Sequence, residues 1–488
     1  MGDSKNLYKE SHSLLRESQM IILNKYFLRD PSQKWFWFLF SLIVKGLPFL
    51  ILLHSKPLND IPGFWGIAHG DSYSYLAPIE SFISSGNYQP DFRMPGYGIV
   101  FYPFLLLFSK AIACNIIITL QYIAAAISVY YLALTAKNIL ASNRVFYITF
   151  YLFLFSYYTN FYDAYIQTEA FFTAALIFAV YYFTEYYQRG SMKYLLCTSL
   201  LLCWLIFMRP VFLPILLLFA LLILLNKNLP IASRFKTALL LLIPFLVCDT
   251  AWVVRNYSVH RRFIPLTVSA LYPYIATSYM QPMFEFEQAW GGSAVLTDNK
   301  TSAIDSVPND IYTSQFNNDS LVHLKDLIAS LQQANLDSAK DVAYENELKT
   351  KFALYKLSIA KEKPFLYYFI APLKLTKDFL YGQENRDMLE RGKGNPIIGS
   401  ILVLFNKVLY LLIVLLGFIG AFIVAIKGFR HNYFYWLISL IPLYILIIHP
   451  IILRYATNRF LIPAYPFLIA CTAYILCEIY ARLSQKPI

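Results

Sequence analysis

Apolar runs long enough to cross a lipid bilayer recur through most of this chain, and they decide its fold class. A helix needs about 20 apolar residues to cross the ~30 Å hydrocarbon core, and runs of that kind occur, for example, at 35–54, 115–134 and 433–453. Inside the hydrocarbon every backbone N–H and C=O must be paired, which a helix achieves within itself. The composition agrees, with 58% apolar and only 14% charged residues. The sequence therefore predicts an all-α polytopic membrane protein.

The positions of the Lys and Arg residues predict how these spans are oriented. Cytoplasmic loops carry an excess of Lys and Arg, and most basic residues behind the formal charge of +12 stand at the ends of apolar runs. This pattern favours contact with anionic membrane lipid, and we do not expect nucleic-acid binding. About ten spans with both termini inside satisfy the rule, namely 35–54, 115–134, 145–158, 170–187, 194–208, 211–225, 237–254, 396–426, 433–453 and 460–480.

Four regions follow from this topology. Residues 1–34 are basic, lack a cleavable apolar leader and are expected in the cytoplasm. A membrane domain covers 35–254 and includes a first outer loop at 55–97, a polar extracytoplasmic insert covers 255–396, and 397–488 hold the last spans. Because no organellar address is present, we expect a multi-pass protein of a bacterial inner (plasma) membrane. The six cysteines lie in or beside apolar segments and are interpreted as core residues.

Two short segments near the first outer loop are expected to lie at the interface. Residues 72–82 have the mixed composition of a helix that lies along the membrane surface. The run 98–109 has about twelve residues, or ~18 Å of helix, against a ~30 Å core, and Pro103 interrupts it. We therefore expect a re-entrant or interfacial segment there.

Helical periodicity also appears in the insert. The apolar residues of 321–331 and 342–359 recur at helical spacing, which predicts two amphipathic helices packed on the outer face of the membrane domain. The apolar run 364–380 is interrupted by polar residues and Pro372, and it is expected to dip into the interface.

The first outer loop carries chemical groups that a membrane anchor does not need. Asp71, Glu80 and Asp91 are carboxylates, and Arg93 follows them. A carboxylate can deprotonate a hydroxyl nucleophile, and a planar guanidinium can donate two parallel hydrogen bonds to a phosphate. Because a lipid phosphate is acidic enough to leave without a general acid, its main requirement is charge stabilisation by arginine. The same outer face is expected to collect Asp163, Glu169, Arg209, Arg255, Arg261, Arg262, Arg454 and Arg459.

Four motifs in order along the chain resemble those of a known superfamily. They are HGDSYSYLAPIESFISSGNY with RMPGYG in the first outer loop, IQTEAFF at a helix start, WVVRNYSVHRRFIPL after an outward span, and NRFLIPAYPFL before the last span. The ordered set resembles the GT-C glycosyltransferases, in the branch of the lipid A aminoarabinose transferases and protein O-mannosyltransferases. The resemblance implies a GT-C-like bundle, a polyprenyl-phosphate (undecaprenyl-phosphate type) sugar donor, attack by an acceptor on the outer face with inversion, and often a divalent metal.

The resemblance implies roles for three acids. Asp71 matches the first-loop acid, which serves as the general base or orients the acceptor. Glu169 matches the second-loop acid, and Asp163 is a substitute for it. The family often has two adjacent acids where this chain has Asp71 followed by Ser72. Whether the chain binds a divalent metal is therefore left open, and no cofactor is assigned.

The resemblance also implies substrate-binding residues. Arg93, Arg255 and Arg459 match basic positions expected to hold the donor phosphate. Tyr73, Tyr75 and Tyr97 are candidates to stack on a sugar. Each candidate has a plainer interpretation as well. An acid at a helix start can cap it or interact with its dipole, an arginine at a span end can snorkel to the headgroups or set the topology, and a tyrosine can belong to an interfacial belt. His69 and His260 are interpreted as ordinary polar residues rather than metal ligands.

The expected function is transfer of a sugar from a polyprenyl-phosphate donor to a hydroxyl acceptor, which can be a glycan, a lipid or a protein, on the extracytoplasmic face. One alternative is a polysaccharide polymerase or ligase, a class with no evident use for an acid in the first outer loop. The other is a lipid-linked-sugar flippase, which predicts charged residues at mid-span depth. Lys45, Glu185 and Asp249 are the candidates for such residues.

Overall fold

The computed structural model describes residues 29–54, 59–88, 93–266, 279–292, 307–333, 339–382 and 396–484. Within these ranges the regular secondary structure is helical, apart from one isolated parallel bridge between Ile67 and Tyr165. The prediction of an all-α membrane protein is confirmed. Asp91 and most of the segment 1–34 lie outside the described residues.

Six helices of the described chain are long and apolar enough to cross a membrane. They are α2 (Lys34–His54), α6 (Lys110–Leu140), α12 (Ile231–His260), α20 (Pro396–Arg430), α21 (Trp436–Ile447) with its continuation η7 (Ile448–Leu453), and α22 (Tyr465–Ser484). The remaining predicted spans coincide with α7 (Asn143–Leu154), α9 (Glu169–Arg189), α10 (Met192–Met208) and α11 (Leu213–Leu224). Each predicted span therefore corresponds to a helix.

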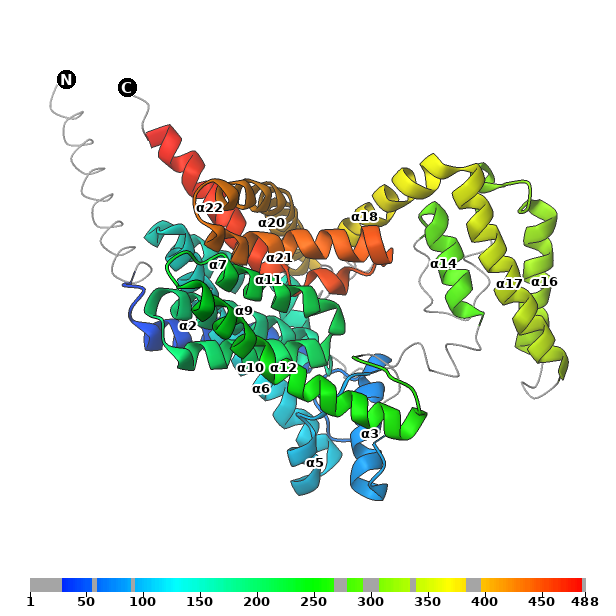
Figure 1. The fold of residues 1–488 in the computed structure, drawn as a ribbon, viewed down its shortest axis with the longest axis horizontal. Coiled ribbons are helices and arrows are strands. Elements are labelled where there is room, and N and C mark those ends of the chain that lie inside the picture. Colours follow the sequence, from blue (N-terminus) through cyan, green and yellow to red (C-terminus); the bar gives the residue numbers. More distant parts are fainter. Residues whose placement is uncertain are drawn as a thin grey trace.

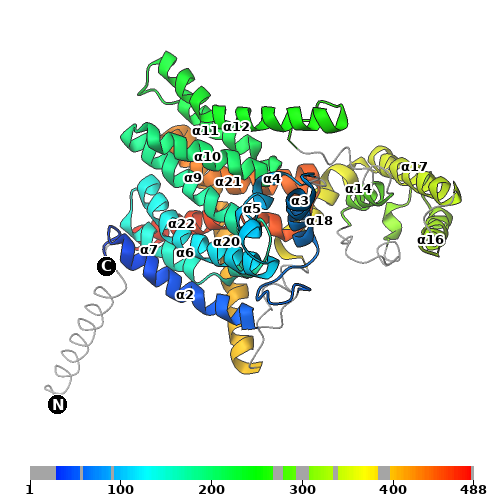
Figure 2. The same ribbon diagram turned by 90° about the horizontal axis from the view of Figure 1, so that it is seen from below.

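The spans form one bundle around a shared hydrophobic core (Figures 1 and 2). The close packing of α20 against α22 depends on small residues, because a Cβ atom at Gly420 would lie 2.5 Å from the carbonyl oxygen of Cys471. The start of α2 and the end of α22 lie at one end of the bundle, and α3 (Asp71–Ser85) lies toward the other. This arrangement agrees with two termini on the same side and the first outer loop on the opposite side.

The segment after the first outer loop does not form a span. It consists of α4 (Pro95–Gly98) and α5 (Tyr102–Leu107). A six-residue helix is about 9 Å long, which is too short for the hydrocarbon core. Leu106, Leu107 and Phe108 are exposed, as expected of an interfacial element.

The insert has a hydrophobic core of its own. The predicted amphipathic helices are α16 (Asn318–Gln333) and α17 (Ala339–Glu362), and their apolar stripes are buried. The stripes pack against each other and against Phe286 and Trp290 of α14 (Met280–Trp290). The prediction that they pack on the outer face of the membrane domain is wrong. Figure 1 shows these three helices standing apart from the bundle.

The insert is joined to the bundle through α18 and the segment after η7. The run 364–380 exposes Phe369 and Leu373, and its expected dip into the membrane interface stays a prediction. The run forms η5 (Leu366–Ile370) and α18 (Ala371–Tyr381), and Phe379 is buried in the bundle core. Arg454 donates hydrogen bonds to the carbonyl oxygens of Tyr367 (2.8 Å) and Gln288 (3.2 Å). One residue later, the ring of Tyr455 stacks on Phe284 of α14 at 5.5 Å.

Candidate functional site

Backbone pairing brings the first and second outer loops together. The Ile67 amide donates to Ala164 O, and the Ile166 amide donates to Ile67 O, both at 2.9 Å. Gly66 permits this approach, because a Cβ atom there would lie 2.6 Å from Ala164 O. Ser72, the second residue of α3, donates from its hydroxyl to Ile166 O at 2.9 Å. The start of α3, with Asp71, is thereby held beside the start of α9, with Glu169.

Asp71 lies between two arginines from distant parts of the chain. Its Oδ1 is 2.6 Å from Arg93 Nη2, and its Oδ2 is 2.8 Å from Arg459 Nη1. Arg93 is oriented by hydrogen bonds to the hydroxyls of Ser74 (3.0 Å) and Tyr75 (3.1 Å) on α3. The side chain of Asp71 is 34% exposed, so this carboxylate stands at an open surface rather than in the core.

Glu169 forms the buried half of the same network. Its Oε1 pairs with Arg209 Nη2 at the end of α10 and lies 3.6 Å from Arg459 Nε. Arg209 Nε also donates to the Thr168 hydroxyl at 2.9 Å. Arg459, on the short helix η8 (Asn458–Leu461), therefore contacts both carboxylates. One guanidinium links the first outer loop to the second.

The network carries an excess of positive charge. Three guanidinium groups, those of Arg93, Arg209 and Arg459, meet two carboxylates, which leaves a net charge of +1. Burial alone raises the pKa of Asp71, but the adjacent guanidinium groups outweigh it and hold this pKa below its usual value. The same carboxylates raise the pKa of Arg459 against the opposing effect of its burial. The charged forms are stabilised, and a further anion is needed to neutralise the cluster.

Two proposed substrate-binding residues lie elsewhere. Arg255, on α12, donates to the Tyr88 carbonyl at 2.5 Å and to the Asn256 side chain at 3.0 Å. Tyr73 shares a hydrogen bond with Asp60 rather than with Asp71. The structure does not bring either side chain into the Asp71 network.

Tyr97 and Asp163 lie in the interior. The Tyr97 hydroxyl donates to Gln121 Oε1 at 2.6 Å, and the residue is fully buried. Asp163 pairs with Lys45 at 3.1 Å, and both side chains are almost completely buried. Neither residue faces the open side of Asp71, so a role in contacting substrate would require a rearrangement.

The structure also bears on the plainer interpretations of the two acids. Asp71 is the first residue of α3, the residue before it is Gly70 with a φ of 53°, and no side-chain capping bond forms. Its carboxylate is directed at arginines instead. Glu169 is the first residue of α9, so a favourable interaction with the helix dipole coexists with its arginine pairs.

The sequence predicts Arg209 on the outer face but assigns it no catalytic or binding role. It lies directly before Pro210 at the end of an outward span, and it is stacked near the rings of Phe172 and Phe460 at 5.6 Å and 5.5 Å. Only the tertiary structure reveals that it pairs with Glu169. The sequence marks Arg209 only as a basic residue at the outer end of a span, and several other arginines share that property.

The donor set does not fit a divalent metal. In the described parts of the chain, no three His, Cys, Asp or Glu side chains gather at one point. Both oxygens of Asp71 face guanidinium groups, and so does one oxygen of Glu169. Their positive charge opposes a second cation at the same oxygens.

Comparisons with known proteins give similarity to solved structures alone. No protein-family model matches the chain, and no curated protein matches it. An oligosaccharyltransferase of Archaeoglobus fulgidus tethered to an acceptor peptide is 13% identical with a TM-score of 0.43, and the match covers 92% of this chain and 50% of that one. The oligosaccharyltransferase AglB of the same archaeon, with an inhibitory peptide and a dolichol-phosphate, is 12% identical with a TM-score of 0.44 over 92% and 51%. The chain spans about half the length of these structures.

Proposed function

We propose that the chain is a GT-C-type integral membrane glycosyltransferase that moves a sugar from a polyprenyl-phosphate donor to a hydroxyl acceptor on the extracytoplasmic side. The observation that carries the proposal is the Arg459 guanidinium, which contacts both Asp71 and Glu169 beside an accessible surface. The ordered motifs of the sequence supplied these same three residues. The proposed donor is consistent with the net charge of +1, because a lipid phosphate neutralises it.

Each group has a task in the proposed reaction. The acceptor oxygen attacks the anomeric carbon, and the bond from that carbon to the phosphate oxygen breaks. The bonding electrons pass to the phosphate, whose added charge is stabilised by Arg459 and Arg93. Asp71 accepts the hydroxyl proton or orients the hydroxyl. Glu169 holds Arg209 and Arg459 in place, and its burial separates it from the acceptor.

The mid-span charges support a transferase over a flippase. A transport path needs charged groups that are available to a moving substrate. Lys45 pairs with Asp163, Glu185 pairs with Arg189 at 2.6 Å, and Asp249 accepts from the Leu266 amide at 3.0 Å. These three charged side chains are thus engaged by local partners.

The test is sugar transfer from a radiolabelled polyprenyl-phosphate donor pool in membranes that contain wild type or Asp71→Asn at matched protein levels. We expect loss of labelled product for Asp71→Asn, because the amide neither accepts the proton nor pairs with both arginines. Asp60→Asn is the matched control, since Asp60 lies in the same loop and bonds Tyr73; it should label normally. Equal labelling by Asp71→Asn and wild type would remove Asp71 from the reaction, and no labelling by wild type would favour a polymerase or a flippase.

A further inference from the structure

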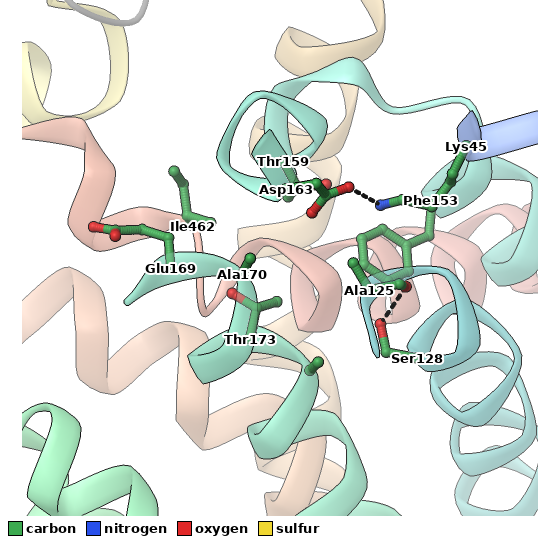
Figure 3. Close-up of a pocket in the computed structure, with 11 residues that line it drawn as sticks. Lys45, Ala125, Ser128, Phe153, Thr159, Asp163, Glu169, Ala170, Thr173 and Ile462 are labelled. Carbon is green, nitrogen blue, oxygen red and sulfur yellow. Dashed lines mark hydrogen bonds and ion pairs between the residues drawn. The ribbon is translucent and has the colours of Figure 1, made fainter. Parts of the chain in front are cut away.

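A lysine in the middle of the first span is held in the core by an aspartate from the second outer loop (Figure 3). Lys45 lies eleven residues into the 21-residue α2 and is 1% exposed. Its Nζ is 3.1 Å from Asp163 Oδ2 and 5.6 Å from the ring centre of Phe153. A buried ammonium group in the middle of a span destabilises the fold unless it is paired. The carboxylate of Asp163 supplies this pairing.

The aspartate belongs to a segment of irregular backbone that packs against the middle of the first span. Between α7 and α9, residues 155–168 form only the short helices α8 (Tyr157–Asn160) and η1 (Phe161–Ala164). Such backbone is tolerated inside a membrane only where protein surrounds it. Gln121 of α6 supplies part of this support, since its Nε2 donates to Tyr165 O at 2.9 Å. Lys45 adds an ion pair to the segment from α2.

The same segment ends at the candidate transfer site. Asp163 lies six residues before Glu169, and Gln167 and Thr168 between them contact Arg459 and Arg209 respectively. A displacement of the segment would therefore move the carboxylate that organises two arginines.

A small cavity lies between the ion pair and the first turns of α9 (Figure 3). Its volume of about 10 Å³ is near the space that one water needs. Among its lining residues, Thr159 and Thr173 have hydroxyls without a hydrogen-bond partner in the described chain, and both are more than nine-tenths buried. Lys45 and Asp163 cancel each other's charge, and Glu169, which also lines the cavity, is paired with Arg209. The fitting ligand is therefore a neutral one.

We propose that Lys45 is a positioning residue, which fixes Glu169 through Asp163 and the segment 155–168, and that one water completes this support in the cavity. The effect on transfer rests on the proposed function. The anchoring of segment 155–168 by Lys45 does not rest on the proposed function, so it is tested by a measurement that needs no substrate.

The experiment is amide hydrogen exchange on peptides that cover 155–168, in purified full-length protein carrying Lys45→Met, Asp163→Met or both changes. The single changes leave a buried charge unpaired and should lower the melting temperature. The double change should recover most of this loss, yet the segment should still exchange about tenfold faster than in wild type. A double variant that exchanges like wild type over 155–168 overturns the proposal.

A matched pair controls for the loss of charge. Lys427 of α20 and Glu478 of α22 lie 3.4 Å apart, and each is about 40% exposed. Lys427→Met with Glu478→Met should leave exchange over 155–168 unchanged. If wild type transfers sugar, the Lys45 and Asp163 double variant should lose kcat with little change in acceptor KM. If wild type transfers nothing, the proposed function fails and the exchange result still decides the anchoring.

Valine substitution tests the water. If the cavity is hydrated, Thr159→Val removes a ligand of the water and lowers the melting temperature. Thr149 of α7 is the control, because it is also buried with an unpartnered hydroxyl but does not line this cavity. If the cavity is dry, both changes remove an unpaired hydroxyl and have the same neutral or stabilising effect. That result removes the water from the proposal.

Discussion

At the residue scale, the site depends on the ability of a guanidinium group, unlike an ammonium group, to contact two carboxylates at once. Arg459 uses Nη1 for Asp71 and Nε for Glu169 at the same time. A planar fork with several donors can contact two carboxylates in fixed directions, whereas an ammonium is a single point charge on a flexible stem. One side chain therefore links the carboxylates of the two outer loops.

Arg459→Lys should separate the two carboxylates. The positive charge remains, but one ammonium does not reach both Asp71 and Glu169. Loss of a group that stabilises developing charge lowers kcat by about 10²–10³-fold, and we expect a fall of that order in sugar transfer. Arg262→Lys, at an exposed outer position, is the control. Transfer by Arg459→Lys within a few fold of wild type would contradict a bridging role.

The dependence on pH follows from the lowered pKa of Asp71. An aspartate whose folded pKa lies below its unfolded value contributes stability above the unfolded value, near 3.9, and loses it as pH falls through the folded pKa. The arginine pairs of Asp71 should therefore persist from neutral pH down to about pH 4. Any loss of sugar transfer between pH 7 and pH 5 should keep the same midpoint in Asp71→Glu as in wild type, because Asp71 stays ionised over this range. A midpoint near pH 6 assigned to Asp71 would contradict this.

How far the sequence predicts the site differs from residue to residue. Asp71, Arg93 and Arg459 follow from motifs and topology, since each stands at an outer loop or span end, and the structure places them together. Tyr97 lies four residues after Arg93 in the same motif, yet its side chain enters the core and bonds Gln121. Sequence proximity within a loop does not determine on which side of the local backbone a side chain falls.

At the scale of single elements, the helix α14 carries a buried acid. Glu287 is 3% exposed, and its Oε1 has no hydrogen-bond partner within the described residues. Burial raises the pKa of Glu287 to about 7. The protonated form is therefore favoured in the folded insert.

The stability of the insert should fall as pH rises. A group whose folded pKa is raised contributes stability below its unfolded pKa and loses it as pH increases through the folded value. Between pH 4.5 and pH 7 this loss is on the order of 3 kcal/mol. The protection of α14 peptides against hydrogen exchange, taken relative to the intrinsic amide rate at each pH, should fall over this range in the full chain, and Glu287→Gln should remove the fall. The same pH response in wild type and Glu287→Gln would assign it to another group.

Amphipathic patterns also show how far the sequence predicts the packing of a helix. The stripe of α17, with Leu348, Phe352, Tyr355 and Ile359, is buried as its spacing predicts. The pattern predicts that one face of the helix is buried, but it does not predict which element covers that face. Here the partners are α16 and α14, and α14 is an 11-residue helix that the apolar pattern of the insert did not single out.

At the scale of the whole molecule, the insert and the bundle meet close to the candidate site. Arg454 holds two carbonyl oxygens of the insert, and its guanidinium lies 3.9 Å from the ring centre of Tyr367. Arg459 follows five residues later. The insert is thus attached to the chain segment that supplies the bridging arginine.

Arg454→Ala should loosen this attachment. The carbonyls of Gln288 and Tyr367 lose the hydrogen bonds from Arg454, and α14 loses part of its contact with the bundle. We expect faster proteolysis between the insert and the bundle, and faster hydrogen exchange in the peptide that contains Arg459. Arg430→Ala, at the inner end of α20, is the control. Protection at Arg459 equal to wild type would show that the insert and the site are mechanically independent.

The separate core of the insert has a consequence for how such a chain changes over generations. Substitutions among Phe286, Leu324 and Phe352 repack three helices and leave the bundle core unaltered, because the two clusters have different members. The core of the insert can therefore change while the arginines and carboxylates keep their geometry, as long as the carbonyls of Gln288 and Tyr367 still receive Arg454. Among descendants of this sequence, variety should accumulate first in the insert, which stands apart from the bundle.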